Sequence, residues 1–189
     1  MLAMKLISEE YLTSNKKQEK KRRQNLKEEI RCLRVADAET SIAMLEKFSY
    51  ENCTVIITDL ILGTDLDDLY KNCRKYLDEE EARNILANLI KGVARLRDKE
   101  RLITHRDIHS KNVMLHFPCL VATNEEKKNP IKYWNSLPKR IAECCKNLHD
   151  ASMFQVKIID YGFAKVLEEG QMTRTPFGVP FTKAPESEF

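Results

Sequence analysis

Two polar side chains with complementary chemistry, Asp107 and Asn112, stand five positions apart in residues 105–112, H-R-D-I-H-S-K-N. Ile103 leads into this polar stretch and the apolar residues 113–115 follow it, so we expect a short loop that ends in a strand. A loop with this spacing can present a carboxylate to a hydroxyl group and an amide oxygen to a metal ion. The segment therefore predicts a site that handles a hydroxyl substrate beside a bound cation.

Two further charged residues end or interrupt apolar segments. Residues 156–160, V-K-I-I-D, predict a buried strand that delivers Asp160 to the mouth of a site. Residues 1–7 predict another strand, and Lys5 lies inside it.

Four segments then occur in one order: L-A-M-K at 2–5, H-R-D-x-x-x-x-N at 105–112, D-Y-G at 160–162 and A-P-E at 184–186. Together they resemble the signature segments of eukaryotic-type protein kinase domains and are most similar to those of the serine/threonine kinases. The resemblance implies an α+β, two-lobed protein-kinase-like fold. The family places two more strands and a glycine-rich loop upstream, and further helices downstream, so we expect a partial kinase domain, truncated at both ends.

The implied domain organisation is a partial N-lobe with the hinge over 1–62 and a partial C-lobe over 63–189, with an insert at about 118–155. The implied activity is transfer of the γ-phosphate of ATP to a serine or threonine hydroxyl of a protein substrate, with ATP and Mg2+ as cofactors. Such transfer depends on in-line positioning and on compensation of phosphate charge. The implied catalytic residues are Asp107, Lys5, Asn112 and Asp160, of which Asn112 and Asp160 bind metal. The implied nucleotide-binding residues are Lys5, Glu29, Asp59, Ile61, Asp65 and Met114.

The resemblance also implies that Arg106 pairs with a phosphate on Thr173 or Thr175 of the activation loop, a charge-assisted bond that orders a loop. An implied internal stack consists of His105, Tyr161 and Leu33.

Simpler interpretations of several residues stay open. A lysine on a short strand, such as Lys5, is by itself typical of a surface residue. Residues 16–33 predict a helix, because they lack glycine and proline and are rich in strong helix formers. On this helix Glu28 competes with Glu29 as the partner of Lys5, and both can be solvated carboxylates. Asp65 suits the N-cap of a helix as well as a contact with ribose.

Two departures from the serine/threonine kinase pattern concern one position in space. Where the family has a lysine and a threonine that support the transferring phosphate, this chain has His109 and Val179. A neutral imidazole supplies one donor and valine supplies none. With the missing glycine-rich loop, these changes favour an alternative: a catalytically impaired pseudokinase or scaffold fragment that binds nucleotide or a partner protein.

The rest of the pattern predicts the elements that position the site. We expect a loop at 8–15, strands at 42–45 and 54–58 joined by a turn at 50–52, and helices at 65–76 and 79–98. In the insert we expect a polar mobile stretch at 118–130, an amphipathic helix within 137–154, and Trp134 either packed in the core or bound to a partner.

Composition sets the broad class. With 189 residues, 42% hydrophobic and 32% charged, the chain can form one globular unit. The net charge of +3 argues neither for nor against nucleic-acid binding. The basic run 16–23 is expected to be a solvated helix face, with a localisation or nucleic-acid patch as the weaker alternative. Six scattered cysteines without a C-x-x-C pair predict no zinc site and a reduced, cytoplasmic setting. We expect neither secretion nor a membrane span. An uncovered apolar face on the 79–98 helix would favour aggregation or a regulatory protein partner.

Overall fold

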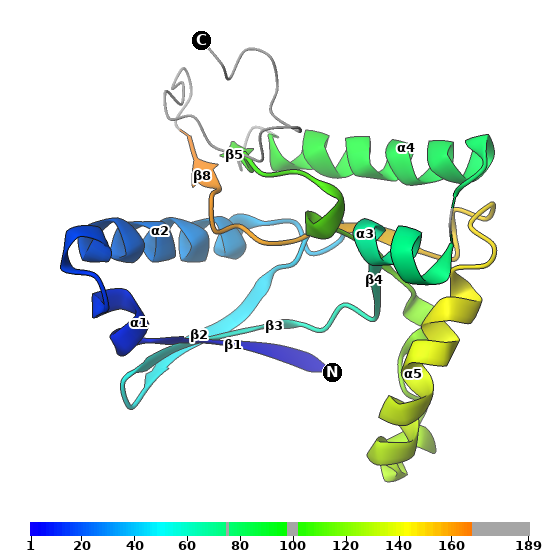
Figure 1. Ribbon diagram of the computed structural model, residues 1–189, viewed down its shortest axis with the longest axis horizontal. Helices are drawn as coiled ribbons and strands as arrows, with labels where there is room; N and C mark the ends of the chain where they lie inside the picture. The colour runs from blue at the N-terminus through cyan, green and yellow to red at the C-terminus, as the bar shows by residue number, and fades with distance from the viewer. Residues whose placement is uncertain (75, 98–101, 168–189) are drawn as a thin grey trace.

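The computed structural model describes residues 1–74, 76–97 and 102–167. Figure 1 shows a strand-rich part, covered by α2, that adjoins a larger part containing α4 and α5. This division into a small strand-rich region and a mainly helical region confirms the expected fold class.

The strand-rich part is an antiparallel sheet with β3 in the middle. Its strands are β1 (Leu2–Ser8), β2 (Met44–Tyr50) and β3 (Cys53–Asp59). β3 is rich in branched apolar residues, which fit a pleated surface, and its Val55 and Ile56 are almost fully buried. The strand predicted at 1–7 and the turn predicted at 50–52 are confirmed, whereas β2 begins two residues later than predicted and is longer.

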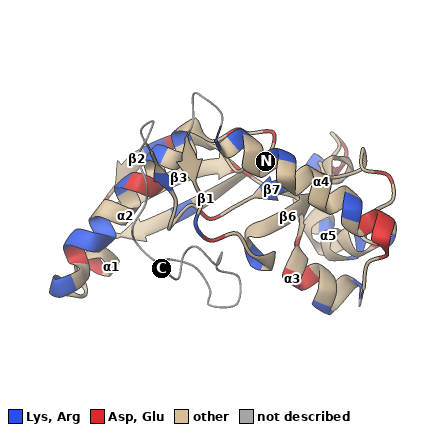
Figure 2. Ribbon diagram, turned by 90° about the horizontal axis from the view of Figure 1, so that it is seen from above, with Lys and Arg blue, Asp and Glu red and all other residues tan. Residues whose placement is uncertain are grey.

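Two helices follow β1: α1 (Glu9–Thr13) and α2 (Lys16–Val35). The prediction of a loop at 8–15 was wrong, because the Ser8 hydroxyl accepts the Tyr11 amide hydrogen at 3.1 Å and caps a short helix. The helix predicted at 16–33 is confirmed. The basic run 16–23 occupies the first half of α2, where Figure 2 shows lysine and arginine, and Arg23 forms ion pairs with Glu9 and Glu19.

A second antiparallel sheet lies in the larger part, with β6 in the middle. Its strands are β4 (Gly63–Asp65), β6 (Val113–His116) and β7 (Gln155–Ile158). A Cβ atom at Gly63 would lie 1.7 Å from the carbonyl oxygen of Leu115, so β4 can approach β6 this closely only with glycine at this position.

The chain after β4 is helical in three pieces: α3 (Leu66–Asp68), the π-helical η1 (Leu69–Cys73) and α4 (Glu79–Leu96). The short helix predicted at 65–76 is present, but it becomes π-helical at Leu69 and ends at Cys73, because the chain is already extended at Arg74. α4 confirms the main part of the longer predicted helix and begins with a capping box made by Asp78 and Glu81. Its apolar stripe is only partly covered, since Ile85 is buried whereas Leu86 is 55% exposed.

The insert after β6 is more ordered than the sequence indicated. It contains η3 (Pro118–Leu120), η4 (Glu126–Lys128) and α5 (Pro130–Cys144). The helix starts before the predicted 137–154, because Asn129 caps it and proline occupies its first turn, where no amide hydrogen is needed. Of the two alternatives for Trp134, packing in the core is wrong, because Trp134 is 46% exposed whereas its neighbour Tyr133 is 3% exposed.

The two parts share one buried core. It contains Cys32, Leu33, Ile56, Leu96, Ile103, Ile158, Tyr161 and Ala164. The loop after α2 also joins β7, because the amide of Ile158 donates to Thr40 and the amide of Ile42 donates to Ile158, at 3.0 and 3.1 Å. α2 is thereby fixed relative to the strand that precedes Asp160. Among the described helices, none is both long and apolar enough to cross a bilayer.

Candidate active site

The loop predicted to carry the base follows β5 (Ile103–Thr104), which pairs with β8 (Lys165–Val166). His105, in this loop, is buried, and burial lowers the pKa of its ring, which is therefore neutral. Its Nε2 lies 3.0 Å from the carbonyl oxygen of Ile159, to which it donates. The ring also packs edge-on against Tyr161, with 5.1 Å between centroids. Tyr161 and Leu33 belong to one buried cluster, which is consistent with the predicted internal stack.

Asp107 and Asn112 are in direct contact. The Nδ2 atom of Asn112 lies 3.0 Å from the Asp107 carbonyl oxygen and 3.2 Å from its Oδ2 atom. Asn112 lies in the 3-10 helix η2 (Ser110–Asn112) and is 7% exposed, so the amide fixes the carboxylate from inside the loop. The structure therefore brings together these two residues, as their spacing predicted.

Asp160 lies next to this pair through the backbone. The amide of Ile159 donates to the carbonyl oxygen of Asn112 at 2.9 Å, and Val113 is paired with Ile158 in the sheet. Asp160 adopts a φ of 60° and is exposed, with its Oδ1 atom accepting the Gly162 amide hydrogen at 3.1 Å. A left-handed conformation at a residue other than glycine is found where the surroundings hold it, often at functional sites.

Arg106 also adopts a left-handed φ, of 67°. Its Nε donates to the carbonyl oxygen of Phe163 at 2.7 Å, which ties the loop to the segment after Asp160. Burial lowers the pKa of Arg106 from its ordinary value. Its predicted partners Thr173 and Thr175, together with Val179 and the A-P-E segment at 184–186, lie outside the described residues.

Lys5 and Glu29 form the predicted ion pair. The Lys5 Nζ atom lies 2.5 Å from Glu29 Oε1. The Glu29 side chain is mostly buried, whereas half of the Lys5 side chain is exposed. β1 and α2 therefore hold this ammonium group against a mostly buried carboxylate, and Glu28 is not the partner of Lys5.

The remaining nucleotide-binding candidates lie on the connection from β3 to β4 and on β6. Asp59 ends β3, and Asp65 pairs with Met114 in the sheet. Asp65 also caps α3 by accepting the Asp68 amide hydrogen at 2.8 Å, so its structural role is confirmed. Within the part of the chain that the structure describes, the Ile61 amide has no hydrogen-bond partner, which leaves this donor available to a ligand.

His109 lies beside the predicted base. Its Nδ1 atom accepts the Lys111 amide hydrogen at 3.3 Å, and its other ring nitrogen is Nε2. That atom lies 3.6 Å from Asp107 Oδ2 and 3.1 Å from Asn112 Nδ2. The imidazole therefore borders both polar residues of the loop.

Sequence reasoning missed two residues that support this site. The buried ammonium of Lys157 donates to the carbonyl oxygens of Ala38 and Glu39, at 2.5 and 2.8 Å, and burial lowers its pKa. His116 Nδ1 accepts the Leu62 amide hydrogen at 3.0 Å and so fixes the chain next to Ile61. A lysine inside the apolar run 156–159 was the only available signal.

The predicted metal ligands fit a magnesium ion by their chemistry. Because Asn112 Nδ2 faces Asp107, the amide oxygen of Asn112 is the atom left for a cation. Asp160 adds an exposed carboxylate. Oxygen donors of these two kinds suit Mg2+.

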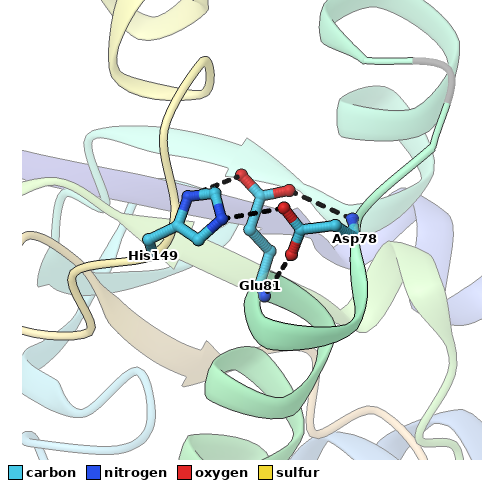
Figure 3. A group of neighbouring side chains, drawn as sticks. All are labelled: Asp78, Glu81 and His149. Carbon is cyan, nitrogen blue, oxygen red and sulfur yellow. Dashed lines mark hydrogen bonds and ion pairs between the residues drawn. The ribbon is translucent and has the colours of Figure 1, made fainter.

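A separate cluster of titratable side chains lies at the start of α4, where Figure 3 shows Asp78, Glu81 and His149 converging. His149 Nε2 lies 2.8 Å from Asp78 Oδ2. Glu81 is fully buried, and its carboxylate accepts from Arg74 and from the amides of Leu148 and Asp78. Because these donors already surround Glu81, the cluster of Asp78, Glu81 and His149 has a structural role and links the insert to α4.

The domain has two parts that share one core. The loop with Asp107, the carboxylate of Asp160 and the ion pair of Lys5 with Glu29 lie on elements that pack on this core. This arrangement defines the class of kinase-like folds. The family model described as "Protein kinase domain" matches residues 1–187, so the chain belongs to this family.

Curated relatives carry the same family name. The chain is 29% identical over 172 residues to the serine/threonine-protein kinase ULK1 of Homo sapiens, covering 91% of this chain and 14% of the relative. It is 26% identical over 164 residues to human death-associated protein kinase 2, covering 87% and 35%. It is 30% identical over 132 residues to the serine/threonine-protein kinase dst3 of Dictyostelium discoideum, covering 70% and 17%. The chain thus spans at most about a third of the length of these relatives.

Proposed function

We propose that this chain acts as a protein kinase domain that transfers the γ-phosphate of ATP to a serine or threonine hydroxyl of a protein substrate. The contact between Asp107 and Asn112, joined through Ile159 to Asp160, supports this most strongly. The names of two quoted relatives, which are serine/threonine-protein kinases, support the choice of hydroxyl.

Nucleotide binding is assigned to both parts of the fold. Lys5, held by Glu29, compensates phosphate charge. The Ile61 amide and the Asp59 backbone bind the base, while Asp65 and Met114 face the nucleotide from β4 and β6. The capping contact of Asp65 uses one of its carboxylate oxygens, so the other can accept a ribose hydroxyl.

Asp107 positions the substrate hydroxyl and accepts its proton. Its carboxylate is held by Asn112 at 3.2 Å, so little reorganisation is needed when the hydroxyl arrives. Asn112 and Asp160 would hold Mg2+, which compensates negative charge on the phosphates when bound.

The decisive experiment measures radiolabelled phosphate transfer from ATP to a generic basic protein. Asp107→Asn keeps the side-chain shape but removes the carboxylate, so we expect a loss of about 10²–10⁴-fold in rate. Asp150→Asn, at an exposed turn of the insert, is the matched control and keeps full activity. Equal labelling by wild type and Asp107→Asn would contradict the proposal.

A second function, nucleotide binding without turnover, is favoured by the position of His109. Its Nε2 atom borders Asp107 and Asn112, where the family has a lysine ammonium. Thermal-shift measurement with magnesium and ATP separates the two functions. Stabilisation without any phosphate transfer favours the pseudokinase, whereas turnover excludes it.

We further propose a cytoplasmic location and a regulatory protein partner that covers the exposed apolar residues of α4. Leu86 and Ile90, 55% and 59% exposed, motivate the partner. Unchanged partner capture by Leu86→Glu would refute the proposal that the partner binds this face of α4.

A fluorescently tagged chain found outside the cytoplasm would refute the proposed location.

A further inference from the structure

Four of the six cysteines gather at the end of the insert helix, although the sequence scatters them. They are Cys73, Cys119, Cys144 and Cys145. The sulfur atoms of Cys119, in η3, and Cys144, the last residue of α5, are 3.7 Å apart. Cys73 is the neighbour of Cys145. Cys119 is exposed and Cys144 is half-buried, so solvent reaches the first pair.

A hydrogen bond that does not involve the thiols fixes η3 against α5, the helix that ends at Cys144. The hydroxyl of Tyr133 donates to the carbonyl oxygen of Leu120 at 2.6 Å, and both residues are almost fully buried. This bond fixes the residue after Cys119 against α5. Two reactive groups held in this way react as if highly concentrated.

We propose that Cys119 and Cys144 form a reversible dithiol–disulfide modification site that reacts with hydroperoxides. A disulfide has an S–S length of about 2.05 Å, so the sulfur atoms must approach by roughly 1.7 Å. Rotation of the exposed Cys119 side chain supplies this movement. The inference is independent of phosphate transfer.

The reaction has two steps. The Cys119 thiolate attacks hydrogen peroxide, so an S–O bond forms, the O–O bond breaks and water leaves after protonation. Cys144 then attacks the sulfur of the Cys119 sulfenic acid, so the S–S bond forms, the S–O bond breaks and a second water leaves. In total the two thiols lose two electrons and two protons, and the peroxide is reduced to two water molecules.

Burial sets the order of these steps. It raises the pKa of Cys144 to about 11 and that of Cys145 to about 12, and the thiolate is the reactive form. Exposed Cys119 is therefore oxidised first and Cys144 resolves it. The resulting bond ties the end of α5 to the exit of β6, the strand that follows the Asp107 loop.

The test treats the reduced 189-residue chain with hydrogen peroxide, blocks the remaining thiols and maps tryptic peptides by mass spectrometry. We expect peptide 112–127 linked to peptide 141–146, with two thiols lost per chain and both restored by dithiothreitol. Because Cys144 and Cys145 share the second peptide, variants assign the bond. Cys119→Ser and Cys144→Ser lose the link, whereas Cys145→Ser and the distant control Cys53→Ser keep it.

Three results would overturn the inference. The first is the absence of a link, including oxidation of Cys119 only to sulfinic acid. The second is a link that joins Cys73 to peptide 141–146 instead. The third is a link that persists in Cys144→Ser but disappears in Cys145→Ser.

Discussion

The close approach of β4 to β6 gives a sharp prediction for Gly63→Ala. The added Cβ atom would lie 1.7 Å from the carbonyl oxygen of Leu115, whereas real Cβ contacts are essentially never under 3.0 Å. The strands must therefore separate by about 1.3 Å, the difference between these distances. The obstacle is a backbone atom, so no side-chain rotation can relieve it.

Separation weakens the pairing of Gly63 with His116 and of Thr64 with Leu115. Losing about two ladder hydrogen bonds costs roughly 1 kcal/mol each, and the strain of overpacking adds about 1–3 kcal/mol. We therefore expect Gly63→Ala to lower the free energy of unfolding by about 3–5 kcal/mol. ATP affinity should fall too, because Ile61 and Asp65 flank this position.

Urea unfolding followed by circular dichroism measures the first effect, and titration with ATP measures the second. Gly92→Ala in α4 is the matched control, because the tightest contact of its Cβ would be with the end of the Ile158 side chain, at 3.3 Å, and its contacts with Thr40, at 3.5 and 3.7 Å, would be ordinary. Alanine also favours the helix interior by about 1 kcal/mol, so this variant should match or exceed wild-type stability. A Gly63→Ala protein within about 0.5 kcal/mol of wild type would refute the reasoning.

Three further predictions concern charged side chains. Glu29→Gln should lower the rate of phosphate transfer, because it removes the charge that holds Lys5. The circular dichroism spectrum should stay unchanged. An unchanged rate would exclude a role of Glu29 in holding Lys5. Glu81→Ala should cost about 3–5 kcal/mol in urea unfolding, because it removes the carboxylate that pairs with Arg74 and leaves two amides without their acceptor. A cost under about 1 kcal/mol would contradict the structural link that Glu81 makes between the insert and α4. Hydrogen bonds, first of all from the Glu81 amide, hold the pKa of Asp78 below its ordinary 3.8. The stability that Asp78 contributes is therefore complete above pH 3.8, and it is lost as the pH falls through the lower pKa of the folded state. Asp78→Asn should reduce this acid sensitivity, measured as unfolding free energy against pH, and an unaltered pH profile would refute the assignment.

The sequence predicted the catalytic loop well because its chemistry is local. Asp107 and Asn112 meet within one short loop, so their spacing alone places them together. The pairing of Lys5 with Glu29 joins residues 24 positions apart, and it was predicted through resemblance to a family. The roles of these residues in phosphate transfer remain proposals.

Elements that depend on tertiary packing were predicted less well. The insert resembles no segment of the family, so the sequence could not show which aromatic residue, Tyr133 or Trp134, is buried. Tyr133 is the buried one because η3 supplies the acceptor for its hydroxyl. The cysteine pair was missed for a similar reason, because Cys119 and Cys144 meet only after α5 folds back on η3. Lys157 was overlooked because its carbonyl partners lie in the distant loop after α2.

A double-mutant cycle on magnesium-dependent ATP affinity tests most directly whether Asn112 and Asp160 hold one shared cation. Asn112→Ala and Asp160→Ala should each weaken binding in the presence of magnesium, and the double variant should lose less than the sum of the two, with a coupling of about 0.5–3 kcal/mol. Additive losses, or losses that persist equally without magnesium, would contradict the account.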